Sequence, residues 1–263
     1  MTAADRVQAA FARNFDRGVE VGAAVSVWEH GREVVSCCQG WRDAARSVPW
    51  DHDTLVLVWS ATKGLASACV LHALDRAGLD LSVRVADFWP AFAQAGKAHL
   101  TVGEVVSHRA GLAALDDQTA GLLDHDAVAA AIERQPPLWE PGGGHGYGPR
   151  TYGFLADEIV RRIAGQPLGT YWREWFGDPL GLDLWIGLPE DQHGRVAQML
   201  AARAGCGGGE EAFGLAMATP GSITRMAFSA PAGPLGATAM NAPAVRSASL
   251  PSLGGIGRAS ALA

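Results

Sequence analysis

The first forty residues carry two different hydrophobic patterns in succession. Apolar side chains recur at four-residue spacing within residues 3–17, which is typical of an amphipathic helix. Two β-rich runs follow at 21–28 and 33–39, and the polar residues 29–32 between them predict a hairpin turn. We therefore expect the chain to begin with one helix and a two-stranded antiparallel hairpin.

Helical periodicity dominates the middle of the chain. The strongest patterns cover residues 61–77 and 151–164, and each is followed by a glycine, Gly78 or Gly165, that suits a helix C-terminus. Shorter helices are expected at 101–108, 126–135 and 168–176, with a short apolar run at 55–59 leading into Ser60. Five glycines and two prolines within 140–149 predict a loop.

The last quarter of the chain has a different composition. Gly207-Gly208-Gly209 is interpreted as a linker, because no strand-to-helix pattern surrounds it that would suit a phosphate-binding loop. Residues 215–263 are rich in Ala, Gly, Pro and Ser, and part of this segment is expected to be poorly ordered.

Composition narrows the class of protein. With 48% hydrophobic and 18% charged residues, the 263-residue chain fits a soluble globular protein with a substantial core. Its net charge of −6 argues against a nucleic-acid partner. The first twenty residues carry acids and no long apolar run, and no run of eighteen apolar residues occurs, so we expect a cytoplasmic protein without a membrane partner. Four cysteines are interpreted as free thiols: Cys37, Cys38, Cys69 and Cys206.

The sequence Ser60-Ala61-Thr62-Lys63 is the main candidate for chemistry. A serine and a lysine three positions apart on a helix share one face, so the amine can take the proton of the hydroxyl. The chain holds only one other lysine, Lys97, and its other nineteen basic residues are arginines, which stay protonated and cannot act as bases. This SxxK motif indicates a serine nucleophile activated by a lysine.

A proton relay to the leaving group would need a third side chain. Tyr147 is the best candidate, because it lies in the glycine-rich loop, where the backbone can approach a ligand closely. The alternative is a loop tyrosine that packs on the surface. Among the histidines, His145 is interpreted as a loop residue or a substrate contact, and His108 as a structural residue at a helix end. The histidines lack metal-ligand spacing, so neither a metal nor a cofactor is expected.

Several segments, in their order along the chain, resemble one family. The chain is similar to the serine β-lactamase-like hydrolases, in particular the class C β-lactamase-related or family VIII carboxylesterases. The resemblance is carried by the hairpin at 21–40, Val58–Gly64, Val106–Leu112, Trp139–Gly142, His145–Tyr147, Thr151–Gly153, Pro179–Leu182, Trp185–Pro189 and Gly254–Gly257.

This resemblance implies an α+β fold, an α/β sandwich of the β-lactamase/transpeptidase type. It combines an antiparallel sheet flanked by helices with a mainly helical lobe. The chain would form a single domain over 1–263, with the helical lobe at about 60–200 and the sheet-side elements at about 1–58. Ser60 would be the acylated nucleophile, Lys63 its base and Tyr147 the proton relay. The substrate partner would be a small ester or lactam.

Two departures from the family pattern matter. Tyr147 is followed by Gly148-Pro149, where the lactamases have Tyr-x-Asn, and the missing amide favours esters over lactams. Arg258–Ala263 carry no Lys-Thr-Gly or His-x-Gly strand, so the resemblance implies a domain that is incomplete at its C-terminus, with the C-terminal strands missing. Three alternatives stay open: a carboxylesterase, a penicillin-binding or D-Ala-D-Ala peptidase or β-lactamase activity, and an inactive truncated or split form.

Overall fold

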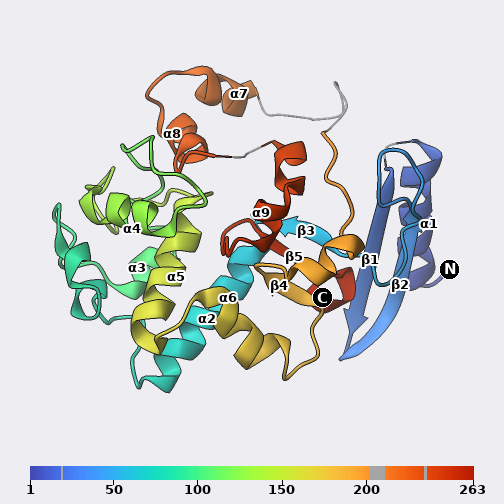
Figure 1. The fold of residues 1–263 in the computed structure, drawn as a ribbon, viewed down its shortest axis with the longest axis horizontal. Coiled ribbons are helices and arrows are strands. Elements are labelled where there is room, and N and C mark those ends of the chain that lie inside the picture. Colours follow the sequence, from blue (N-terminus) through green and yellow to red (C-terminus); the bar gives the residue numbers. More distant parts are fainter. Residues whose placement is uncertain (19, 202–210, 234–235) are drawn as a thin grey trace.

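The computed structural model describes residues 1–18, 20–201, 211–233 and 236–263 (Figure 1). Its α-helices are α1 (Ala3–Asp16), α2 (Thr62–Arg76), α3 (Val102–Val106), α4 (His125–Arg134), α5 (Thr151–Ala164), α6 (Leu168–Trp172), α7 (Glu211–Ala218), α8 (Ile223–Ser229), α9 (Pro243–Ser247) and α10 (Ala259–Leu262). Its strands are β1 (Gly22–Glu29), β2 (Arg32–Gly40), β3 (Val56–Trp59), β4 (Leu184–Ile186) and β5 (Gly255–Gly257). Shorter helical turns lie at Val85–Asp87, Pro90–Ala93, Arg173–Gly177, Glu190–Arg195 and Ala237–Asn241.

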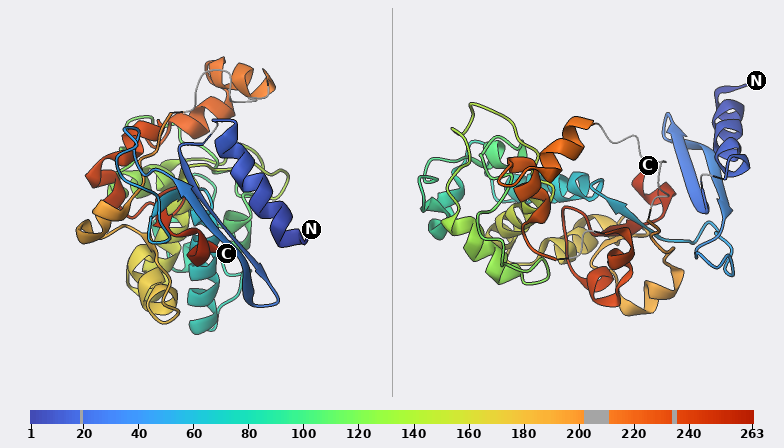
Figure 2. Two further views of the ribbon diagram at one scale, coloured as in Figure 1. Left: turned by 90° about the vertical axis from the view of Figure 1, so that its right-hand side faces the viewer. Right: turned by 90° about the horizontal axis from the view of Figure 1, so that it is seen from above.

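The N-terminal helix and hairpin form one end of the molecule, as the sequence predicted. Strands β1 and β2 pair antiparallel around the two-residue turn His30-Gly31, whose φ angles of +50° and +75° suit a type I′ hairpin turn. Helix α1 packs against β2, and α10 packs against β1 (Figure 2). The two ends of the chain therefore lie on the same side of the molecule.

A second antiparallel sheet joins segments that are distant in the sequence. Its strand order is β3-β5-β4, so the short strand β5 lies between two strands that precede it in the chain. Val56 and Leu184 both lie opposite Gly257, whereas Trp59 lies opposite Gly255. The register of the β3–β5 pair shifts between Leu57 and Trp59, which places a bulge directly before Ser60.

The hydrophobic core is built around α2 and α5, which pack against each other. Helix α5 is buried over its first ten residues, 151–160, and α2 buries one face from Leu65 to Leu74. Helices α3, α4 and α6 contact α5 from its other sides (Figure 1). This arrangement fixes the first turn of α2 relative to the first turn of α5, which is where the candidate site forms.

Together these elements give the α+β architecture that the sequence predicted. Part of the segment after residue 215 was expected to be poorly ordered if its packing partners were missing; among its described residues, Leu250, Leu253 and Ile256 are core residues. Cys37, Cys38 and Cys69 are free thiols. Cys206 and the proposed linker Gly207–Gly209 lie outside the described residues. The division into lobes at about residue 60 stays a prediction.

Within the described ranges, no helix combines the length and the apolar composition that crossing a membrane requires.

Candidate active site

Ser60 lies at a sharp junction between β3 and α2. Trp59 adopts a left-handed conformation with φ of +48°, which is strained for a bulky residue, and the chain turns there from strand to helix. The helix begins at Thr62, so Ser60 lies in the turn before α2 rather than within it. Lys63 N–H donates to the Ser60 carbonyl at 3.0 Å, and this turn brings the two side chains together as the SxxK spacing predicted.

Thr62 holds this junction against β5. Its buried hydroxyl donates to the Trp59 carbonyl and accepts a 2.8 Å hydrogen bond from Gly255 N–H. A Cβ atom on Gly255 would lie 2.5 Å from the Thr62 Oγ1 atom, so the close approach of the two segments requires glycine there. The local sequence gives no signal of this role, because Gly255, the partner of Thr62, is far away in the chain.

Lys63 is buried, with only 8% of its surface exposed, and among the described residues it forms no ion pair with a carboxylate. Its Nζ atom lies 3.3 Å from Ser60 Oγ and donates to the carbonyls of Pro149 at 3.0 Å and Ser252 at 2.7 Å. Burial lowers the pKa of Lys63 to about 7. A neutral amine has two N–H donors for the two carbonyls and one lone pair for the Ser60 hydroxyl, which matches these three contacts.

The Ser252 carbonyl reaches Lys63 because its segment packs directly on the first turn of α5. A Cβ atom on Gly153 would lie 2.5 Å from Ser252 N, and the Ser252 hydroxyl donates to the Arg150 carbonyl at 3.0 Å. Ser252 was not among the site residues predicted from the sequence. Gly153, a glycine inside the strong helical pattern of α5, is the signal that could have indicated this close approach.

Tyr147 completes the cluster from the glycine-rich loop. Its hydroxyl donates to Ser60 Oγ at 2.8 Å, and the centre of its ring lies 4.8 Å from Lys63 Nζ. The side chain remains 43% exposed, so the cluster faces solvent on the Tyr147 side and protein on the Lys63 side. Lys63 and Tyr147, both predicted from the sequence, therefore contact the same atom, Ser60 Oγ.

His108 supports the loop that carries Tyr147. Its ring lies 5.0 Å from the Tyr147 ring, 4.8 Å from the Tyr152 ring and 5.8 Å from the ring of the exposed His145. Burial lowers the pKa of His108 to about 4, with smaller contributions from Lys63 and His145. The imidazole is therefore neutral at physiological pH. His108 lies just after the end of α3, and this helix end is next to the site.

The other lysine is not part of this cluster. Lys97 is fully buried, and its Nζ atom donates to the carbonyls of Gln94 at 2.9 Å and of Glu133 and Gln135 at 2.8 Å each. Its burial lowers its pKa to about 8. Three backbone acceptors satisfy the amine, so Lys97 ties the segment before α3 to the end of α4.

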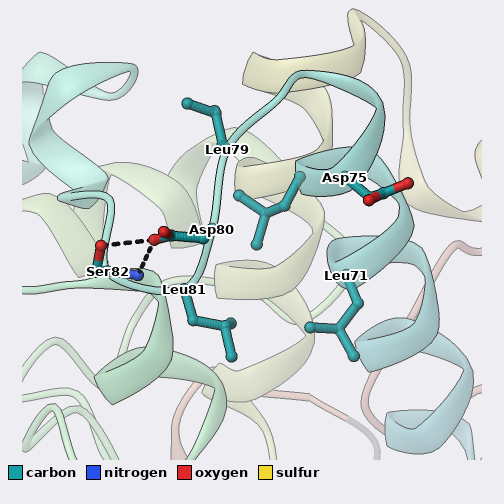
Figure 3. A pocket seen from close by; sticks show the side chains of 7 residues that line it. Leu71, Asp75, Leu79, Asp80, Leu81 and Ser82 are labelled. Carbon is teal, nitrogen blue, oxygen red and sulfur yellow. Dashed lines mark hydrogen bonds between the residues drawn. The ribbon is translucent and has the colours of Figure 1, made fainter.

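A surface pocket on the helical side offers no comparable chemistry. It has a volume of about 440 Å³ and is lined by Leu71, Leu74, Asp75, Leu79, Asp80, Leu81 and Ser82 (Figure 3). Asp80 Oδ1 accepts hydrogen bonds from both the N–H and the hydroxyl of Ser82, at 2.7 and 2.5 Å. In the part of the chain that the structure describes, no three His, Cys, Asp or Glu side chains gather in a way that could hold a metal ion.

The chain is similar in sequence and in fold to several known proteins. The esterase/beta-lactamase LipL of Mycobacterium tuberculosis is 37% identical over 201 residues, which cover 73% of this chain and 45% of LipL. Among solved structures, a family VIII carboxylesterase is 37% identical with a TM-score of 0.83, over 97% of this chain and 66% of that chain. A penicillin-binding protein homolog from Caulobacter crescentus is 37% identical with a TM-score of 0.80, over 96% of this chain and 65% of that chain.

The chain thus spans less than half of LipL and about two-thirds of the two solved structures. The profile of the family described as Beta-lactamase matches residues 11–255, which is nearly the whole chain. From its fold, its Ser60-centred cluster and this match, the chain belongs to the beta-lactamase family.

Proposed function

We propose that this protein is a serine hydrolase that cleaves small carboxylic esters through an acyl-Ser60 intermediate. The observation that carries the proposal is the pair of contacts on Ser60 Oγ, one from Tyr147 at 2.8 Å and one from Lys63 at 3.3 Å. Lys63 would be the base and Tyr147 the proton relay. A lysine with a pKa of about 7 is partly neutral at physiological pH, so it can accept the proton that serine must lose.

In the acylation step, Ser60 Oγ forms a bond to the ester carbonyl carbon while its proton moves to Lys63 Nζ. The Ser60 N–H, in the turn that precedes α2, supplies one donor for the oxyanion. When the tetrahedral intermediate collapses, the bond to the alcohol oxygen breaks, and the Tyr147 hydroxyl gives its proton to the departing alkoxide. Lys63, which lies against the Tyr147 ring, then returns its proton to the phenolate.

In the deacylation step, water takes the place of the alcohol. Tyr147 first passes its phenolic proton to the neutral Lys63, and the phenolate then accepts a proton from water as the water oxygen attacks the acyl carbon. When the second tetrahedral intermediate collapses, the bond to Ser60 Oγ breaks, the carboxylic acid leaves, and Lys63 gives its proton to Ser60 Oγ. Tyr147 thus acts as the acid in one half-reaction and as the base in the other, and no proton is gained or lost over the cycle.

The choice of esters as the substrate class rests on two observations. LipL is named as an esterase and a beta-lactamase, and one of the similar structures is a family VIII carboxylesterase. In this chain, position 149 is a proline whose carbonyl accepts from Lys63, so that residue offers no side-chain amide to a lactam. Esters with short acyl groups are the substrates we propose.

Hydrolysis of a chromogenic acetate or butyrate ester tests the proposal directly. A fluorescent phosphonate should label the wild-type chain on Ser60, and Ser60→Ala should abolish both the labelling and the turnover. Ser107→Ala is the matched control, since the Ser107 hydroxyl bonds the Gly103 carbonyl on α3, away from the cluster. Turnover that survives in Ser60→Ala would exclude Ser60 as the nucleophile.

A second candidate function is penicillin recognition by the same serine. The similarity to the penicillin-binding protein homolog from Caulobacter crescentus favours it, as does a 33% identity over 144 residues to a putative D-alanyl-D-alanine carboxypeptidase of Escherichia coli. A fluorescent penicillin that labels Ser60 stably, together with no measurable turnover of the chromogenic esters, would select this function over ester hydrolysis.

A further inference from the structure

Residues 108 and 109 run alongside the glycine-rich loop and bond it at four points. Near the start of the loop, Gly142 N–H donates to the Arg109 carbonyl at 3.0 Å, and Arg109 Nη2 donates to the Gly142 carbonyl at 2.8 Å. Near Tyr147, Gly146 N–H donates to the His108 carbonyl at 3.1 Å, and Gly148 N–H donates to His108 Nδ1 at 3.2 Å. The two residues that flank Tyr147 are therefore both bonded to one histidine.

His108 is placed for this contact by its backbone. The capping box between Thr101 and Glu104 starts α3, the helix ends at Val106, and His108 then adopts a left-handed φ of +61°. That conformation turns the residue back towards the loop, and it is one that a non-glycine side chain adopts at a cost. Because the ring is neutral, Nδ1 is free to accept the Gly148 N–H while the proton stays on Nε2.

The loop has little stiffness of its own around Tyr147. Glycine stands on either side of it, and the Tyr147 side chain is 43% exposed, so packing alone does not fix the ring. The hydroxyl must nevertheless lie within hydrogen-bond distance of Ser60 Oγ for proton transfer. A misplacement of about 1 Å at a reacting group can cost roughly 10²-fold in rate.

We propose that His108 is a positioning residue that fixes the Tyr147 hydroxyl on Ser60 by bonding the backbone on both sides of Tyr147. This inference rests on the proposed function, because His108 would affect catalysis only by positioning Tyr147, the proposed proton relay. The His108 carbonyl accepts from Gly146 N–H and the His108 imidazole accepts from Gly148 N–H, so both sides of Tyr147 are held. The contact between the two rings limits rotation of the Tyr147 side chain.

Two substitutions separate the imidazole from the backbone conformation. His108→Gly removes the Nδ1 acceptor but suits the positive φ, whereas His108→Asn also tolerates that φ and keeps a short side-chain acceptor. We expect His108→Gly to lower kcat on the order of 10- to 100-fold with KM changed less than about threefold, and His108→Asn to recover most of the loss. His30→Gly is the matched control, since His30 is an exposed histidine with φ of +50° in the hairpin turn.

A double-mutant cycle tests whether His108 acts through Tyr147. If it does, His108→Gly should add less than about twofold to the loss already caused by Tyr147→Phe, because the relay is then absent. Independent, multiplying losses would overturn the proposal, as would a His108→Gly variant with a kcat within about twofold of wild type. Thermal unfolding of each variant verifies that the compared proteins are folded.

Amide hydrogen exchange tests the same contact without any turnover. In His108→Gly, peptides that contain residues 142–148 should exchange faster than in wild type, while peptides from α2 should not change. Unchanged exchange in the loop would overturn the role of His108 even in an active enzyme. If the wild-type chain hydrolyses no ester but the loop loses protection, the proposed function fails while the structural contact stands.

Discussion

The Lys63 side-chain nitrogen lies 2.7 Å from the carbonyl oxygen of Ser252, a residue 189 positions further along the chain. This contact and the one to Pro149 give the buried amine two neutral acceptors, and within the described ranges no carboxylate pairs with it. Carbonyl oxygens orient the amine without holding it in the charged form as strongly as an anion would. The two carbonyls therefore orient the Lys63 amine towards Ser60, and the pKa of Lys63 stays low enough for the amine to act as a base.

Ester hydrolysis should depend on pH through Lys63. Burial lowers the pKa of this lysine to about 7, and the charged form cannot accept the Ser60 proton. We expect kcat/KM to fall about tenfold per pH unit below about pH 7 and to level off above it. An ester assay read at a pH-independent wavelength measures this. Lys63→Arg should be inactive across the range, because arginine stays protonated; a wild-type rate that does not change between about pH 5.5 and 8.5 would refute the assignment.

Tyr147→Phe should lower kcat by about 10²- to 10⁴-fold, the usual contribution of a general acid–base group. It should leave the urea midpoint unchanged, because the lost hydroxyl is at the surface. Tyr171→Phe is the control, since it removes a hydroxyl that is 2.7 Å from His72 Nδ1, away from Ser60. That variant should keep its activity and lose about 1 kcal/mol of stability. Equal activity in the two variants would remove Tyr147 from the mechanism.

Thr62→Val should destabilise the fold by about 1–3 kcal/mol, because the buried Gly255 N–H loses its acceptor. Thr62→Ser keeps the hydroxyl and should lose considerably less. Urea unfolding of the three proteins measures the difference. If valine and serine prove equally stable, the hydrogen bond between the α2 junction and β5 contributes nothing, and the junction must be held by packing alone.

Gly153→Ala should destabilise the protein by about 1–3 kcal/mol, because the new methyl group would lie 2.5 Å from Ser252 N and must displace that segment. The same displacement moves the Ser252 carbonyl away from Lys63, so kcat should fall as well. Gly64→Ala is the matched helical control for stability, since its Cβ would meet nothing within 4 Å. It should be neutral or slightly stabilising by helix propensity. A neutral Gly153→Ala would argue against the close packing of α5 on residues 250–253.

Local features of the fold were predictable because short stretches of sequence encode them. The hairpin turn at 29–32, the start of a helix at Thr101 and the helix ends at Gly78 and Gly165 all appear where the pattern placed them. The helix after Ser60 was predicted from 61, one residue early, because the turn at the junction resembles a first helical turn. In the segment after residue 215, composition does not reveal that Leu250 and Ile256 find packing partners in the core.

The sequence alone determined which residues could supply the chemistry. The spacing of Ser60 and Lys63 and the glycine-rich setting of Tyr147 are local properties, and the order of the surrounding segments carried the family resemblance. Only the tertiary structure decided that Tyr147 reaches Ser60 and that the Pro149 and Ser252 carbonyls accept hydrogen bonds from Lys63. The tertiary structure also decided that His108 bonds the loop on both sides of Tyr147. Those contacts join residues that are far apart in the chain, so they depend on how α2, α5 and β5 pack rather than on any local pattern.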